Sequence, residues 1–152
     1  MAKGIKGSTR TGAFVNNAAT SSGSNVILTE VDVGTAKNGL LIVTADINGT
    51  EYLTDMQVVT SINSGVPVSG TQAATSDVCT LVQDTVNSTG ATTVTANTCT
   101  INTDGIYVYD VYNLSRYVNI QYTGTGTSTI ATAVIVATDL EQAPHATATT
   151  AY

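Results

Sequence analysis

Two consecutive β-strands are predicted from the stretch Gly105-Ile-Tyr-Val-Tyr-Asp-Val-Tyr-Asn-Leu-Ser-Arg-Tyr-Val-Asn-Ile-Gln-Tyr-Thr-Gly-Thr-Gly126. Side chains along a β-strand point alternately to its two faces. In the first strand, Ile106–Tyr112, both faces carry apolar groups. We therefore expect this strand at the centre of a sheet, or with its outer face covered by a neighbour. In the second strand, Tyr117–Thr123, apolar and polar side chains alternate, which is typical of a half-buried strand.

The chain from residue 26 onward has the same pattern of short predicted strands. Short runs rich in Val, Ile and Thr, whose branched side chains favour the pleated sheet, are separated by turn residues. No segment shows the 3.6-residue period of an amphipathic helix. We predict an all-β fold of about eight strands, as an antiparallel β-sandwich or as a jelly-roll or barrel-like domain. The other predicted strands are Val26–Val33, Leu40–Ile47, Tyr52–Ile62, Val78–Val86, Thr92–Ile101 and Ser128–Thr138.

One β domain is expected between two extended segments. Residues 26–140 are predicted to form the domain, residues 1–25 an N-terminal arm, and residues 141–152 a C-terminal tail. Both segments are rich in small and polar residues, with too few large apolar side chains to form a core of their own.

Positive charge is concentrated in the N-terminal arm. Lys3, Lys6 and Arg10 are three of the five basic residues of the chain, and the arm contains no acidic residue. We expect these cations to meet an acidic partner surface, while Phe14 and Val15 fill apolar pockets on it. A plain unstructured terminus is the alternative.

The composition excludes several classes of partner. The formal net charge is −6, and only 11% of the residues are charged, against about 25% in an average soluble domain. A chain with this negative charge is repelled by nucleic-acid phosphates, because binding to them needs clustered Lys and Arg. No apolar run approaches the roughly 20 residues that cross a bilayer, and no apolar segment follows the basic N-terminus as in a secretory signal. We therefore expect neither a nucleic-acid nor a membrane partner.

Two cysteines leave two interpretations open. If Val78–Val86 and Thr92–Ile101 form one hairpin, Cys79 and Cys99 face each other at a separation that a disulfide tolerates. The alternative is a pair of reduced, buried thiols, as in most cytosolic proteins.

No constellation of catalytic residues is recognisable in the sequence. One His and two Cys cannot form a zinc site with four ligands. The oxygen-rich segment Asp46–Glu51 lacks the complete pattern of a calcium loop and is better explained as a polar Asn-Gly turn. We predict a protein that is not an enzyme, with no catalytic residue, no metal and no cofactor.

Tyrosine is the strongest local bias of the sequence. Five of the seven Tyr residues lie between positions 107 and 122. Because Tyr buries a large surface and keeps a polar tip, it is enriched in interfaces. We predict subunit contacts through four of these residues; the core of the sandwich and a sugar-binding platform are the alternatives. The four are Tyr107, Tyr109, Tyr112 and Tyr117.

The stretch Gly105–Gly126, followed by Ala133-Val-Ile-Val136, resembles the C-terminal part of small structural proteins of tailed bacteriophages. It is similar to head decoration, or cement, proteins: a strand reaching an Asp, a short turn to Arg-Tyr-Val, a strand, a Gly-Thr hairpin and a final apolar strand. The resemblance covers about a quarter of the chain. It implies a β-sandwich or barrel-like body, trimers on the capsid exterior, and an arm that grips the major capsid protein.

The function expected from this resemblance is structural. The protein would assemble in the host cytoplasm and bind the outside of a phage head as a homotrimer. Its arms would become ordered on the major capsid protein and hold neighbouring capsid subunits together by added contacts. The alternatives are another self-assembling phage subunit, from a tail, fibre or surface lattice, and a glycan-binding β-sandwich module.

Overall fold

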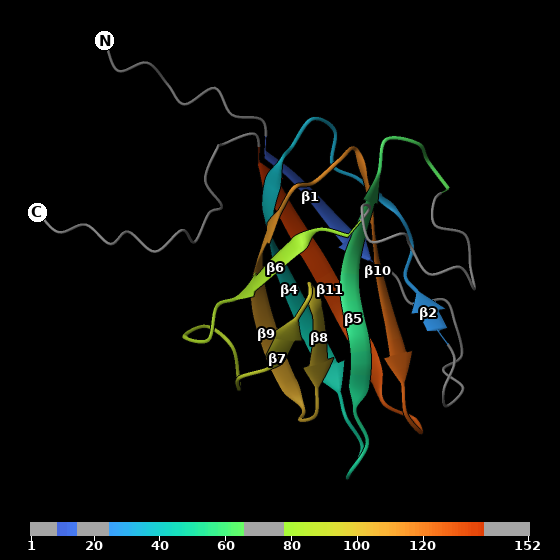
Figure 1. Cartoon of the computed structure of the whole chain (residues 1–152), viewed down its shortest axis with the longest axis vertical. Coiled ribbons are helices and arrows are strands. Elements are labelled where there is room, and N and C mark those ends of the chain that lie inside the picture. The colour runs from blue at the N-terminus through green and yellow to red at the C-terminus, as the bar shows by residue number, and fades with distance from the viewer. Residues whose placement is uncertain (1–8, 15–24, 66–77, 139–152) are drawn as a thin grey trace, which may run out of the picture.

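The computed structural model describes residues 9–14, 25–65 and 78–138, and within these ranges the fold is all-β (Figure 1). Eleven antiparallel strands form two sheets that pack face to face. The predicted antiparallel β-sandwich is thus confirmed, with eleven strands in place of about eight. In the described part of the chain there is no helix long and apolar enough to span a membrane.

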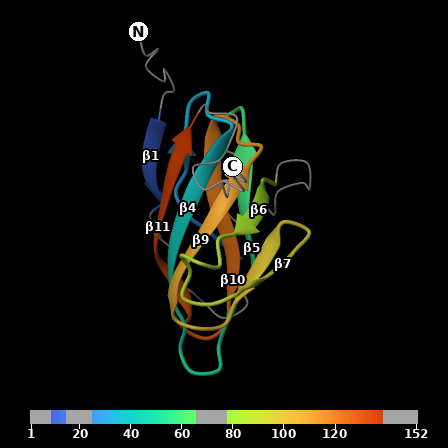
Figure 2. The same ribbon diagram turned by 90° about the vertical axis from the view of Figure 1, so that its left-hand side faces the viewer.

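Sheet I has five strands and forms one layer of the sandwich (Figure 2). Sheet II forms the other layer, and its strands β2 and β3 both lie along the same strand, β10. In spatial order, sheet I contains β1 (Thr9–Phe14), β11 (Thr129–Thr138), β4 (Asn38–Asp46), β9 (Gly105–Tyr112) and β6 (Thr80–Gln83). Sheet II contains β2 (Asn25–Ile27) and β3 (Val31–Asp32), then β10 (Tyr117–Gly124), β5 (Leu53–Ser61), β8 (Thr98–Ile101) and β7 (Thr93–Thr95).

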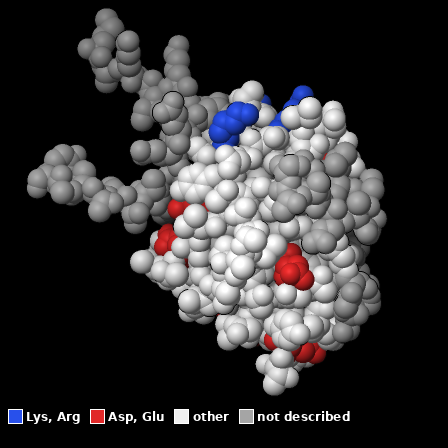
Figure 3. Space-filling view, in the orientation of Figure 1, with Lys and Arg blue, Asp and Glu red and all other residues white. Residues whose placement is uncertain are grey.

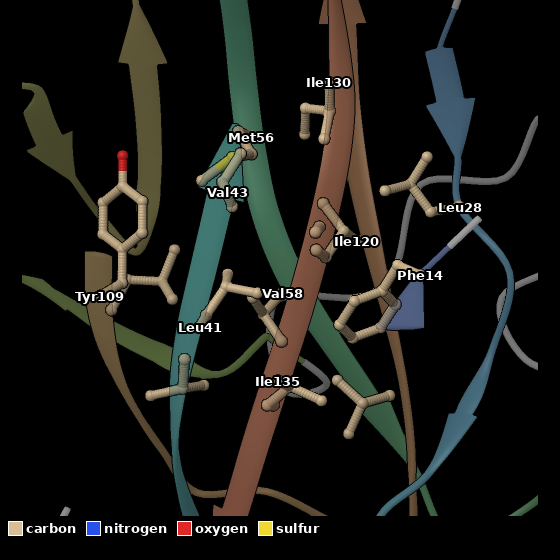
Figure 4. Packing of buried hydrophobic residues seen from close by; sticks show 14 of the residues in the cluster. Phe14, Leu28, Leu41, Val43, Met56, Val58, Tyr109, Ile120, Ile130 and Ile135 are labelled. Carbon is tan, nitrogen blue, oxygen red and sulfur yellow. The ribbon is translucent and has the colours of Figure 1, made fainter. Parts of the chain in front are cut away.

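Alternating apolar side chains fill the space between the sheets. On β10, the side chains of Val118, Ile120 and Tyr122 are fully buried in this core, as the alternation predicts. Figure 4 shows side chains from both layers meeting there, among them Met56 of sheet II and Val43 of sheet I.

Two predicted strands are each divided. The run Val26–Val33 becomes β2 and β3, because one extra residue is accommodated between their pairings with β10. The run Thr92–Ile101 folds into the β7–β8 hairpin around Ala96 and Asn97, whose φ angles are 49° and 66°. Two consecutive positive φ angles define the tight turn that suits the twist of a hairpin.

The N-terminal segment differs from its prediction. Residues Thr9–Phe14 pair with β11 over six residues, and Phe14 is only 4% exposed, inside the core. The prediction of an extended arm is wrong for this segment, and so is the assignment of Phe14 to a partner's pocket. The strand forms despite its small side chains because its backbone covers the edge of β11.

Gly12 allows β1 to pack closely against the opposite sheet. A Cβ atom at Gly12 would lie 2.1 Å from Cγ1 of Val31, so only the absent side chain allows β1 to approach β3 of the opposite sheet. Arg10 is exposed on this strand. Lys3, Lys6, Val15 and the predicted tail 141–152 lie outside the described residues.

The outer edge of β9 is only partly paired by β6. Beyond Gln83, side-chain oxygens replace the missing strand: the Val108 N–H donates to Ser88 Oγ and the Ile106 N–H to Thr89 Oγ1, both at 2.9 Å. The predicted strand Val78–Val86 therefore shortens to four residues, and the segment that follows it protects the sheet edge.

Candidate interaction surface

The outer face of sheet I carries a patch of apolar side chains, although it does not point into the core, and Asp110 lies beside this patch, opposite Leu40 on one side and Val82 on the other. Its central strands carry apolar side chains at successive positions, and every second one points outward. Four of these outward side chains are 36–49% exposed. We call this set the outer apolar face; it consists of Leu40, Ile42, Val82, Ile106, Val108, Val134 and Val136.

Strand pairing makes this surface continuous. Ile42 lies directly opposite Val134 on one side and Val108 on the other, in the middle of three adjacent strands. An antiparallel sheet with one face in water normally alternates polar and apolar residues. In the sequence, apolar side chains on both faces of Ile106–Tyr112 indicated a surface of this kind. That β4, β11 and β6 extend it follows from the strand order, which local sequence patterns do not show.

The predicted tyrosine interface is wrong for two of its four residues. Tyr107 and Tyr109 are 1% and 0% exposed and belong to the core, which was the alternative interpretation. Their hydroxyl groups find partners inside: Tyr107 Oη lies 2.7 Å from Thr103 Oγ1, and Tyr109 Oη lies 3.3 Å from Thr92 Oγ1. Tyr112 and Tyr117 are partly exposed, and their predicted subunit contact stays a prediction.

Of the two interpretations of the cysteines, the structure shows the second, a pair of free, buried thiols, and not the disulfide. The hairpin that would bring the two residues together does not form, because β6 joins sheet I whereas β7 and β8 join sheet II. Both thiols are free and buried: Cys79 donates its backbone N–H to Val58 O, and Cys99 lies opposite Met56. Burial raises the pKa of the Cys79 thiol to about 12 and that of Cys99 to about 11, so both stay protonated at neutral pH.

The basic residues of the described chain gather at one end of the sandwich. Arg10, Lys37 and Arg116 lie at this end, where Thr9 pairs with Thr138; the blue atoms at the top of Figure 3 mark it. Within the described residues, the first and last strand positions thus emerge together beside these cations.

An ion pair orders this basic end. The Arg116 Nη2 lies 3.1 Å from Asp32 Oδ2, and the Arg116 guanidinium lies 5.0 Å from the centre of the Tyr117 ring. Hydrogen bonds from Arg116 and from the Gly34 N–H lower the pKa of the Asp32 carboxyl. Both charged groups are exposed, so the pair contributes little to stability.

At the opposite end, the Glu51 carboxylate ties two turns together. It accepts hydrogen bonds from the Thr127 N–H (2.8 Å), the Ser128 N–H (3.0 Å) and the Ser128 hydroxyl (2.9 Å). Gly126, with a φ of 58°, makes room, because a Cβ there would lie 1.7 Å from Glu51 Oε1. These bonds link the β4–β5 turn to the β10–β11 turn.

We expect the hydrogen bonds between Glu51 and the β10–β11 turn to stabilise the fold less in acid. Hydrogen bonds from Ser128 and Thr127 lower the pKa of this carboxyl below its ordinary value of 4.5. A carboxyl with a lowered folded-state pKa stabilises the fold fully above its unfolded-state pKa, and this contribution is lost as the pH falls through the folded-state pKa. The Tm of Glu51→Gln should therefore lie below that of wild type at neutral pH and approach it in acid. Thermal unfolding of both proteins across this pH range tests the prediction. A Tm difference that stays constant with pH would contradict it.

The described residues contain no group of three or more His, Cys, Asp or Glu side chains that could hold a metal ion. In the Asp46–Glu51 segment, the Glu51 carboxylate is engaged by hydrogen-bond donors of the other turn. These hydrogen bonds make Glu51 part of the link between the two turns.

The chain was compared with protein-family models, curated proteins and solved structures. None of the three comparisons yields a match.

Proposed function

We propose that this protein is a structural subunit of a virus particle: a decoration protein that binds the outside of a phage head and stabilises contacts between major capsid subunits. The outer apolar face of sheet I is the observation that carries the proposal. A two-layer sandwich that worked alone would present polar side chains there. A large exposed apolar patch is characteristic of a surface that other proteins cover.

The occupant that we assign to this face is a second copy of the chain, within a homotrimer. Ile42 and Val134, at its centre, are uncharged and sit on long, rigidly paired strands. Such a surface suits a permanent contact, since interfaces between identical subunits are more apolar than transient ones. The trimer is also what the resemblance of Gly105–Gly126 implies.

The basic end is assigned to the capsid. Arg10, Lys37 and Arg116 lie where the chain enters β1 from the segment that contains Lys3 and Lys6. An acidic surface of the major capsid protein complements this end and would guide the approach of the decoration protein. The cations and the apolar face thus serve different partners.

The double variant Ile42→Lys, Val134→Lys tests the proposal. Both side chains already contact solvent, so the monomer should fold, whereas burying two ammonium groups at a subunit contact is costly. We expect wild type to be a trimer and the variant a monomer, and we expect occupancy on undecorated capsids of the source virus to fall at least about tenfold. Sedimentation equilibrium measures the mass, and electron microscopy of the particles measures the occupancy.

A matched control is the double variant Ile62→Lys, Val86→Lys, which adds the same charge at side chains that are 76% and 89% exposed outside the outer apolar face. It should remain trimeric and bind as wild type does. A monomeric wild type, or polymers of indefinite length in the absence of capsids, would contradict the proposal; the latter would indicate a fibre or lattice subunit.

A further inference from the structure

A polar pocket of about 120 Å³ opens on sheet II, the layer opposite the outer apolar face. Its walls come from three neighbouring strands: β2, β10 and β5. Among the described residues, every lining side chain ends in an amide, a hydroxyl or a carboxylate. The lining residues are Asn25, Asp55, Gln57, Gln121 and Thr123.

A β-bulge builds the pocket. On β10 a single residue separates Gln121 from Thr123, but on β5 two residues separate their partners Gln57 and Thr54. Asp55 is the extra residue, with a φ of 54°, a conformation that is unfavourable in a residue other than glycine. Bulges of this kind re-aim side chains and are common beside functional sites. Here the bulge delivers a carboxylate to the pocket.

A buried donor in the wall of the pocket has no partner among the described residues. Gln57 Nε2 donates to Gln121 Oε1 at 3.4 Å, which leaves the Gln121 amide nitrogen without a hydrogen bond to any described residue. Gln121 is 1% exposed. A buried donor left unpaired is unfavourable, so a molecule that supplies an acceptor here would remove this penalty.

The lining fits neutral hydroxyl groups better than other ligands. A sugar hydroxyl both donates and accepts: it can donate to the Asp55 carboxylate and accept from the Gln121 amide. No Lys or Arg is among the described residues that line the pocket, which disfavours phosphate and sulfate, and the one carboxylate that these residues supply is a weak ligand set for calcium.

We propose that this pocket binds a neutral saccharide, with Asp55 and Gln121 contacting adjacent hydroxyl groups of one sugar ring. The site is independent of the assembly role: the outer apolar face lies on the opposite sheet, so a subunit held by that face keeps the pocket open. A decoration protein with this site would also attach the particle to a glycan-bearing surface.

Titration of ¹⁵N-labelled protein with methyl glycosides of common neutral hexoses and N-acetylhexosamines tests the proposal. We expect at least one glycoside to shift the side-chain NH₂ signals of Gln57 and Gln121 in a saturable manner. Asp55→Asn keeps a residue that tolerates positive φ and removes the negative charge, so it should raise the Kd about tenfold. Gln121→Leu removes the unpaired donor and should weaken binding by a similar factor, with the fold checked by thermal unfolding.

Asp46→Asn is the matched control, because it removes the same charge from an exposed position of β4 outside the pocket. It should leave the Kd unchanged. The proposal is overturned if no glycoside shifts the pocket signals, if calcium shifts them and glycosides do not, or if Asp46→Asn weakens binding as much as Asp55→Asn does. None of these results bears on the trimer or on capsid occupancy.

Discussion

Replacing Phe14 with alanine is expected to lower the free energy of unfolding by about 3–5 kcal/mol, the usual range for a large buried side chain. Phe14 is 4% exposed and belongs to the core cluster that both sheets share (Figure 4). It is also the large apolar anchor of β1, whose other residues are small or point to solvent. Its loss leaves a cavity and weakens the attachment of the strand to β11.

Urea denaturation of Phe14→Ala beside Thr11→Ala measures the effect. Thr11 lies in the same strand but is exposed, so its truncation should change the free energy of unfolding by less than about 1 kcal/mol. If the two variants were equally stable, β1 would not be part of the folded domain. The prediction of an extended N-terminal arm over residues 1–25 would then hold.

The position of Phe14 also decides how the N-terminal segment can be tested. Deleting residues 1–15 would remove β1 together with Lys3 and Lys6, and weak capsid binding would then reflect a damaged sandwich. A truncation that ends before Thr9 removes the two lysines and leaves the strand in place. Only this shorter truncation separates binding from folding.

Local sequence patterns predicted most strands of this fold but could not predict β1. The long strands β4, β5, β9, β10 and β11 follow runs of β-branched and aromatic residues bounded by turn residues, which are local signals. The segment Thr9–Phe14 has no such run. It is ordered by the edge of β11, more than a hundred positions away in the sequence, and composition alone does not show that edge.

The order of the strands could not be predicted from local sequence patterns either. This is why the disulfide interpretation of the cysteines and the predictions for two of the tyrosines were wrong. The cysteine hairpin assumed that neighbouring runs pair, whereas β6 and β8 belong to different sheets. The apolar character of both faces of β9 was visible in the sequence, but which tyrosines point inward depends on which face meets the other sheet. The polar pocket was not predictable, because the bulge at Asp55 leaves no mark in a pattern of alternating residues.

Tyr109→Ala is expected to destabilise the protein by about 3–5 kcal/mol, because this residue is fully buried between the sheets. Tyr109→Phe separates the ring from the hydroxyl group. The hydroxyl contacts Thr92 at 3.3 Å and Cys99 at 3.5 Å, so its removal should cost about 1 kcal/mol.

Tyr112→Ala supplies the contrast between a core residue and a candidate contact residue. Tyr112 is partly exposed at the end of β9, so its truncation should cost only about 1 kcal/mol of folding free energy. If Tyr112 contacts another subunit, its truncation should instead lower the trimer's resistance to dilution, which sedimentation at decreasing protein concentration measures. Tyr109→Phe should leave that resistance unchanged, since its hydroxyl lies inside the sandwich. The interior position of Tyr109 would be contradicted if Tyr109→Ala unfolded at the same urea concentration as wild type but dissociated more easily.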